Sequence, residues 1–254
     1  MTTQELKSLA EGGDVNAMMA LGEHYYNKYQ QDDFPLAAQK ALPWYTLAGR
    51  SGDVEGAIRA MILGSAQILM AKEAAQWNEM SKYSAEISGI SVEFLRNEKL
   101  ANSDAYDEII KCMDICLYAT SISSYLMEDF AEAVEGLEGI EPGSEYYGMA
   151  QVLLGICLSD MDRDLEGTER LMILHNDMKG ILTPTPDTVD EEILERGTLY
   201  LALYYRMLER KPGKAYELIN RALEVIEEPD VRGILLDELA HYKKRLFGGY
   251  TYVE

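Results

Sequence analysis

The sequence predicts an all-α protein of about eleven helices, stacked as antiparallel pairs. Two Gly-Asp turns, at Gly13-Asp14 and Gly52-Asp53, lie 39 residues apart, a length typical of repeats built from two helices. No alternating apolar and polar pattern bounded by hairpin turns predicts a strand. Most predicted connectors are short, as between antiparallel neighbours. We expect a single array over residues 1–254, which can be subdivided into 1–141 and 142–254.

Capping residues and helix breakers set the expected boundaries. A short helix over residues 3–11 ends at Gly12-Gly13, and aspartates at 14 and 53 cap the second and fourth helices. Proline begins the third and last helices, at Pro35 and Pro229, where its missing N–H costs nothing. The longer helical segments cover residues 14–29, 35–51, 53–68, 72–100, 104–127, 129–140, 146–158, 163–179, 191–208, 213–226 and 229–242.

Several residues are expected to interrupt these segments. Pro43 predicts a kink or a late helix start, because proline removes a backbone hydrogen bond inside a helix. Gly89 is expected to separate two helices within residues 72–100. Residues 180–187 are rich enough in proline to predict a linker, and Phe247-Gly-Gly-Tyr250 opens a short tail.

The first helix pair carries small residues where two helices would cross closely. Gly22 on one helix allows the close approach, Ala41 and Ala48 on the next pack under it, and Trp44 fills the wider layer. Such pairs bury their apolar stripes on neighbouring pairs and usually present a surface for binding.

This stretch resembles the Sel-one-like repeat, a relative of the tetratricopeptide repeat, over about residues 9–64. It departs from that pattern at Gly49, Pro43 and Ala57. Near the C-terminal end, Ala215, Ile219 and Ala222 have the spacing of a tetratricopeptide helix, which is a second resemblance. The resemblance implies a right-handed superhelical array, a tetratricopeptide-like solenoid, that acts as an interaction scaffold without intrinsic activity. The matching residues are Gly13, Asp14, Ala17, Leu21, Gly22, Tyr25, Lys40, Ala41, Trp44, Tyr45, Ala48, Gly52 and Asp53.

The charge of the chain restricts its partners. The net charge of −21 disfavours binding to nucleic acid or to anionic membranes. Residues 101–145 hold 11 acidic residues and one base, Lys111, a net charge of −10. This excess is either a solvated helix face that keeps the protein soluble or a docking surface for a basic partner.

The expected location is the cytoplasm. Three cysteines in 254 residues do not make a disulfide framework. The first residues show no basic stretch followed by an apolar run, so we expect no secretory signal, and no apolar segment looks long enough to span a bilayer.

Candidate catalytic and metal sites have simpler explanations. Cys112 and Cys116 share a helix face, but zinc would need two further ligands, so buried thiols are favoured. Glu238 and His241 have the spacing of a di-iron ligand pair that should occur twice, and it occurs once, so a surface pair is expected. We therefore expect no metal, no cofactor and no enzymatic activity.

Tyrosine is the better functional indicator. The chain has 17 tyrosines, and six of them form three pairs of adjacent residues: Tyr25-Tyr26, Tyr146-Tyr147 and Tyr204-Tyr205. Adjacent helical residues point about 100° apart, so one ring of a pair can pack inside while the other faces a groove. The predicted function is a scaffold that binds a protein or peptide, with a regulatory sensor that changes shape on binding a peptide or small ligand as the alternative. The expected partner-binding residues are Asn16, His24, Tyr26, Tyr147, Tyr204 and Arg206.

Overall fold

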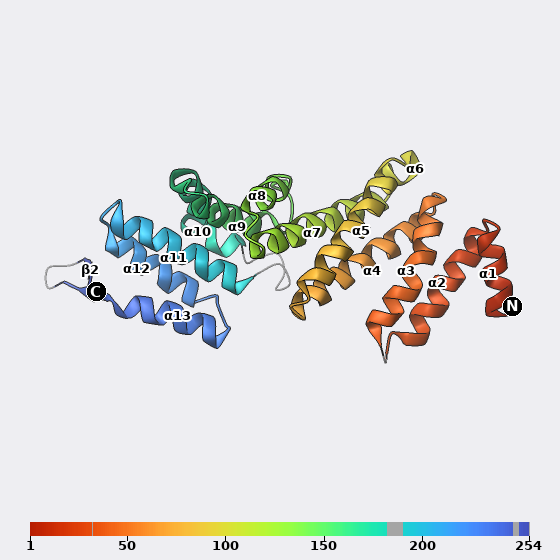
Figure 1. Cartoon of the computed structure of the whole chain (residues 1–254), viewed down its shortest axis with the longest axis horizontal. Coiled ribbons are helices and arrows are strands. Elements are labelled where there is room, and N and C mark those ends of the chain that lie inside the picture. Colours follow the sequence, from red (N-terminus) through yellow and green to blue (C-terminus); the bar gives the residue numbers. More distant parts are fainter. Residues whose placement is uncertain (32, 182–189, 246–248, 254) are drawn as a thin grey trace. The chain divides into compact units, whose positions relative to one another are not determined.

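The computed structural model describes residues 1–31, 33–181, 190–245 and 249–253, without the side chains at 177, 179 and 180. Thirteen helices and one small hairpin make up this described part (Figure 1). In order they are α1 (Thr3–Glu11), α2 (Val15–Tyr29), α3 (Phe34–Arg50), α4 (Val54–Glu73), α5 (Trp77–Leu95), α6 (Glu98–Ala101), α7 (Ala105–Leu126), α8 (Phe130–Glu138), α9 (Tyr147–Asp160), α10 (Asp164–Ile181), α11 (Glu191–Met207), α12 (Pro212–Leu223), α13 (Pro229–Ala240), β1 (Tyr242–Lys244) and β2 (Tyr250–Tyr252).

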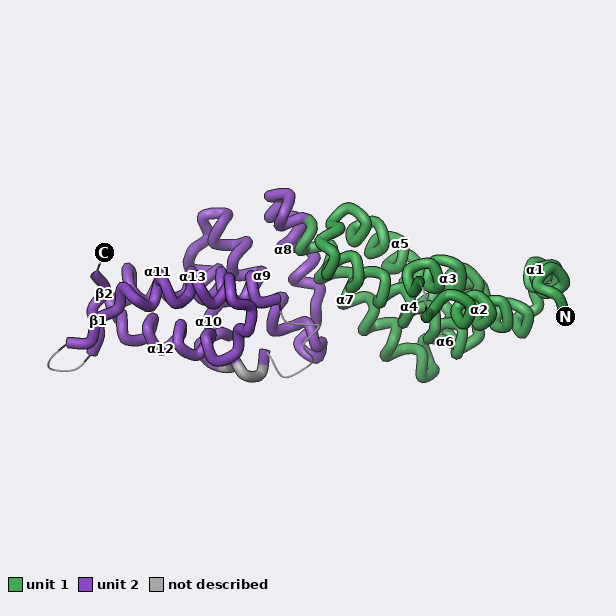
Figure 2. Tube along the Cα trace, turned by 90° about the horizontal axis from the view of Figure 1, so that it is seen from below, with its two compact units in different colours: residues 1–123 green, residues 124–254 purple. Residues whose placement is uncertain are grey.

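The chain forms two compact units, residues 1–123 and 124–254 (Figure 2). The division falls near the end of α7, earlier than the subdivision at residue 141 that the sequence suggested. Within each unit, helices that follow one another in the sequence pack side by side, as expected for a helical repeat.

The Gly-Asp turns cap helices as predicted. The Asp14 carboxylate accepts a hydrogen bond from the Ala17 N–H at 2.9 Å, and Asp53 accepts one from the Gly56 N–H at 2.7 Å. Each bond satisfies a backbone donor that the first turn of a helix leaves without a partner. The glycines before these aspartates have φ of +94° and +81°, a conformation that other residues rarely adopt.

Tyr45 of α3 connects three consecutive helices of the first unit. Its side chain is 1% exposed, and a Cβ added to Gly22 of α2 would lie 2.5 Å from the Tyr45 ring. Its hydroxyl accepts a hydrogen bond of 3.1 Å from Arg59 of α4. The glycine at position 22 therefore gives the tyrosine room to pack between α2 and α4.

A second close contact joins α3 to α5. The Phe94 ring of α5 lies so near Gly49 of α3 that an added Cβ would stand 2.5 Å from the ring. Phe94 is 1% exposed, so its position is fixed by the surrounding core. Two helices that α4 separates in the sequence are thus brought into contact.

The break predicted at Gly89 is wrong, and of the two alternatives at Pro43 the late helix start is wrong. Helix α5 runs without a break through Gly89, because the residues around it bury Ile87 and Ile90 on one face of a single helix. Helix α3 begins at Phe34 and also continues through Pro43, so a late start does not occur. Packing on both sides of these positions outweighs the local preference of glycine and proline to end helices.

The second unit is built around α9. Ten consecutive residues of this helix, Met149 to Leu158, are buried, and α8, α10 and α11 all pack against it. Most of the proline-rich linker expected at residues 180–187 lies outside the described residues.

The expectation of a purely helical chain is wrong at its C-terminal end. Strands β1 and β2 pair antiparallel, with Tyr242 opposite Tyr252 and Lys244 opposite Tyr250. Each strand has only three residues, too few to give a periodic signal in the sequence. The helix number also exceeds the expected eleven, in part because α6 has four residues.

The expectation that no apolar segment could span a bilayer needs correction. Helix α4 is long and apolar enough to cross a membrane, by length and composition. Ten of its residues are buried inside the first unit, as in the core helix of a globular fold.

We predict that Gly22→Val lowers the free energy of unfolding of the first unit by about 1–3 kcal/mol, because the new methyl groups overlap the Tyr45 ring. Urea unfolding followed by circular dichroism measures the change. The control is Gly233→Val on α13, where no atom lies within 4 Å of an added Cβ. Equal stability of the two variants would contradict the close contact between α2 and α3.

Candidate functional site

A groove of about 400 Å³ lies between α3 and α5 in the first unit. Its residues recur at helical spacing on both helices, which gives two facing stripes. The stripes span residues 42–50 and 86–93, which is about 10–12 Å along each helix. The lining residues are Leu42, Pro43, Thr46, Leu47 and Arg50 of α3, and Glu86, Gly89, Ile90 and Glu93 of α5.

The floor of the groove is apolar and its rim is charged. Leu42, Thr46 and Ile90 are buried, and Leu47 is exposed at the edge. At one end, Arg50 Nε donates to Glu93 Oε2 at 2.7 Å. The Thr46 side chain is 4% exposed, and its hydroxyl makes no hydrogen bond within the described part of the chain.

Gly89 is the residue of the groove that the fold itself does not explain. Glycine inside a helix costs about 1 kcal/mol relative to alanine, so it normally has a packing reason. Gly22 and Gly49 have such a reason, since an added Cβ would overlap a buried ring. An added Cβ at Gly89 would meet nothing within 4 Å. The missing side chain leaves the groove open.

The residues that the sequence singled out for partner binding lie elsewhere. Asn16 and His24 are exposed on α2, and Tyr26 is half-buried there, its ring centre 6.2 Å from that of Phe34. Tyr147 on α9 and Tyr204 on α11 are half-buried in the second unit. None of these five lines the groove between α3 and α5.

The tyrosine pairs follow the predicted division only in the second unit. Tyr205 is buried while Tyr204 is half-exposed, and Tyr146 is buried while Tyr147 is half-exposed. In the first unit, both members of the Tyr25-Tyr26 pair are half-buried. The outward rings remain accessible for contact.

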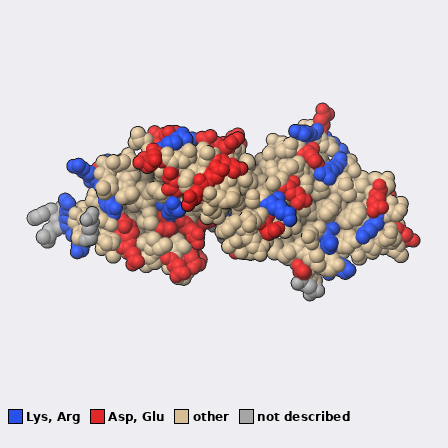
Figure 3. Space-filling model, viewed as in Figure 1, with Lys and Arg blue, Asp and Glu red and all other residues tan. Residues whose placement is uncertain are grey.

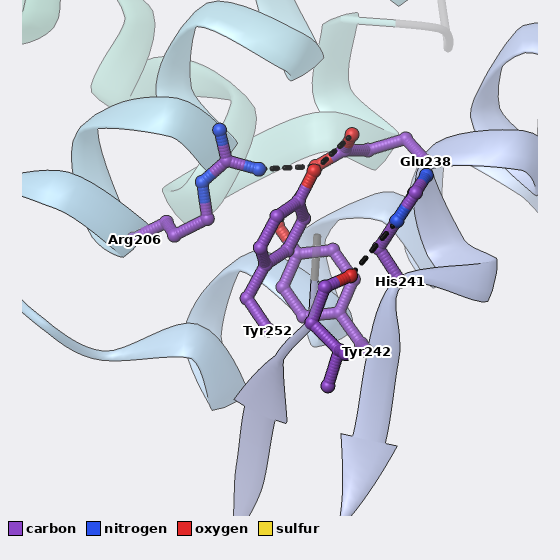
Figure 4. Close-up of polar contacts among 6 residues, drawn as sticks. Arg206, Glu238, His241, Tyr242 and Tyr252 are labelled. Carbon is purple, nitrogen blue, oxygen red and sulfur yellow. Dashed lines mark hydrogen bonds and ion pairs between the residues drawn. The ribbon is translucent and has the colours of Figure 1, made fainter.

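Arg206, the sixth predicted binding residue, holds the C-terminal hairpin (Figure 4). Its Nη1 donates to Glu238 Oε1 at 3.1 Å, and its guanidinium lies 3.7 Å from the centre of the Tyr252 ring. Glu238 also accepts hydrogen bonds from the hydroxyls of Tyr242 and Tyr252, at 3.1 and 3.4 Å.

Glu238 and His241 therefore bind different partners and do not form the predicted surface pair. The Glu238 side chain is 24% exposed and serves three donors, while His241 Nδ1 lies 2.9 Å from the Val253 carbonyl oxygen. Burial raises the pKa of the Tyr242 hydroxyl, and the negative charge of Glu238 adds to this effect. Arg206, Glu238, Tyr242 and Tyr252 therefore form a clasp that connects α11 and α13 to the hairpin.

A further polar cluster lies in the second unit at the end of α9. Asp160 accepts a hydrogen bond from the Tyr200 hydroxyl and one from Arg196 at 3.1 Å. The Arg196 guanidinium lies 5.3 Å from the centre of the Tyr125 ring. Burial raises the pKa of Tyr125 to about 12, an effect that Arg196 partly opposes.

The three cysteines are free and buried. A hydrogen bond with Cys116 lowers the pKa of Cys112, and the same contact together with burial raises the pKa of Cys116. Over the described residues, no group of three or more His, Cys, Asp or Glu side chains is arranged to hold a metal ion.

Acidic charge is concentrated in the second unit. Residues 124–254 hold 27 acidic and 13 basic residues, a net charge of −14, against 17 and 10, a net charge of −7, in residues 1–123. Figure 3 shows the acidic side chains gathered over the region of α8 to α10. Seven of them, and no base, fall within residues 128–145.

No protein-family model matches the chain, and no curated protein or solved structure is detectably similar to it. The repeat resemblance therefore rests on the residues of this chain and on the packing of its helices in sequence order.

Sequence reasoning missed the groove, although its two unusual residues were visible. Pro43 and Gly89 are both disfavoured inside helices, and both were interpreted as interruptions. The structure places them in the two stripes of one groove. The available signal for the groove was a residue disfavoured in helices within an otherwise continuous helical pattern of apolar residues.

We predict that Glu238→Ala makes the hairpin open more easily, because the half-buried Arg206 and two tyrosine hydroxyls lose their acceptor. The expected cost is about 1–3 kcal/mol. Amide hydrogen exchange of residues 242–245 and 249–253 measures it, with the neighbouring exposed Asp237→Ala as the matched control. Unchanged exchange in Glu238→Ala would contradict the clasp.

We predict that Tyr125 destabilises the second unit at alkaline pH. Its folded pKa of about 12 lies above the ordinary tyrosine value of about 10, so the protonated ring favours folding below pH 10, and this contribution is lost as the pH rises to 12. Urea unfolding at pH 8, 10 and 11 should show a shallower loss in Tyr125→Phe than in wild type. Parallel losses in the two proteins would contradict the shifted pKa.

Proposed function

We propose that this protein is a non-catalytic helical-repeat scaffold, and that its groove between α3 and α5 binds a segment of a partner polypeptide. The observation that carries the proposal is Gly89. A helix-interior glycine with no packing neighbour keeps an apolar floor accessible, at a cost to the stability of α5. A ligand that occupies the space above it would account for this cost.

The shape and lining of the groove support a polypeptide ligand. Two facing stripes, of five residues on α3 and four on α5, form a trough with an apolar floor and polar edges, which suits a helix or an extended segment. Leu47, 37% exposed at the edge, offers apolar area that a bound side chain would cover. The unpartnered Thr46 hydroxyl lies beside the same floor.

The finer architecture belongs to the same proposal. We infer a right-handed, tetratricopeptide-like superhelix related to Sel-one-like repeats, supported by helices that pack in sequence order and by the Gly22 and Tyr45 contact. The outward rings of Tyr26, Tyr147 and Tyr204 would add contacts for a protein partner. Three free thiols support a cytoplasmic setting, and the net charge of −21 supports a protein partner over nucleic acid or membrane.

We predict that Gly89→Leu weakens peptide binding at least tenfold without unfolding the protein. Leucine is a better helix former than glycine and meets no atom near its Cβ, so the variant should be at least as stable as wild type. Its side chain would occupy the groove. A phage-displayed library of random 12-residue peptides is selected on wild type, and the selected peptides are measured by fluorescence anisotropy.

The matched control is Gly233→Leu, a helix-interior glycine of α13 that likewise meets nothing within 4 Å. Selected peptides should bind Gly233→Leu as they bind wild type and should bind Gly89→Leu at least tenfold more weakly. If no selected peptide distinguishes Gly89→Leu from wild type, the groove is not the binding site.

A further inference from the structure

The two ends of the groove differ in charge. The only cation among the lining residues, Arg50, is paired with Glu93, where α3 and α5 both approach their C-terminal ends. Seven residues earlier in both helices, Pro43 and Glu86 line the other end. Glu86 is exposed and has no ion-pair partner among the described residues.

The middle of the groove offers the opposite chemistry. Leu42, Leu47 and Ile90 form an apolar surface beside Gly89. Glu86 lies three residues before Gly89 on α5, about 5 Å away along the helix axis. An apolar side chain over the floor and a cation beside Glu86 would thus be separated by about one helical turn in the ligand.

We propose that the groove selects polypeptide segments in which a lysine or arginine lies one helical turn from an apolar anchor. This inference rests on the proposed function and names its ligand. The apolar side chain displaces water from the floor, and the cation pairs with the Glu86 carboxylate. The net charge of −7 on the first unit favours the approach of such a segment.

Glu86→Gln tests the charge requirement while keeping the size of the side chain. Peptides from the selection on wild type, restricted to those that Gly89→Leu fails to bind, are synthesised with their basic residue intact or replaced by glutamine. Their dissociation constants are measured against wild type, Glu86→Gln and the control Glu79→Gln, an exposed α5 residue outside the groove.

The restricted peptides should be enriched in lysine or arginine three or four residues from an apolar residue. Glu86→Gln should weaken them about threefold to fivefold, the range of an exposed ion pair, and Glu79→Gln should leave them unchanged. Replacing the peptide's basic residue should remove the difference between wild type and Glu86→Gln.

Two results would overturn the inference. Peptides that require an open Gly89 but lack a basic residue, and that Glu86→Gln binds as wild type does, would refute the charge selection and leave the groove's proposed function intact. A selection that yields no Gly89-dependent peptide would refute both.

Discussion

The packing of Tyr45 is the interaction on which the first unit depends. Its ring occupies the space that Gly22 leaves open on α2, and its hydroxyl accepts a hydrogen bond from Arg59 of α4. A single buried side chain of α3 thereby fixes the distance and the rotation of the helices before and after it. A larger residue at position 22 would separate α2 from α3 and leave a cavity beside the tyrosine.

The same kind of contact creates the groove. Phe94 against Gly49 holds α5 next to α3, although α4 lies between them in the sequence. Beside this contact, the facing stripes carry a proline, a glutamate without an ion-pair partner among the described residues, and a glycine whose added Cβ would meet nothing within 4 Å, so the floor stays open. The contact between Phe94 and Gly49 is tight, and the surface beside it is open. Adjacent residues of the same two helices would thus stabilise the fold and bind a ligand.

Local interactions made much of the fold predictable. Asp14 and Asp53 cap helices through bonds to residues three positions away, and Gly22 lies at the spacing that helix pairs need. The continuation of α3 through Pro43 and of α5 through Gly89 was not predictable, because it depends on packing from other helices.

The hairpin and the groove depend on contacts between segments far apart in the sequence. Strands β1 and β2 are three residues long and are held by Arg206 and Glu238, and by Tyr250 stacked on Tyr216 at 3.9 Å between ring centres. No local pattern of residues could indicate these contacts. Arg206 was predicted to bind a partner, and its observed contacts are with Glu238 and Tyr252 of the same chain.

The most direct test of the account is an NMR measurement of the Gly22 and Tyr45 contact in the intact protein. With selectively labelled glycine and tyrosine, we expect nuclear Overhauser effects between the Gly22 α-protons and the Tyr45 ring protons, and an aromatic ring-current shift of those α-protons. Absence of both signals in a folded sample would mean that α2 and α3 do not nest at this glycine, and would contradict the role of Tyr45 in fixing the helices of the first unit.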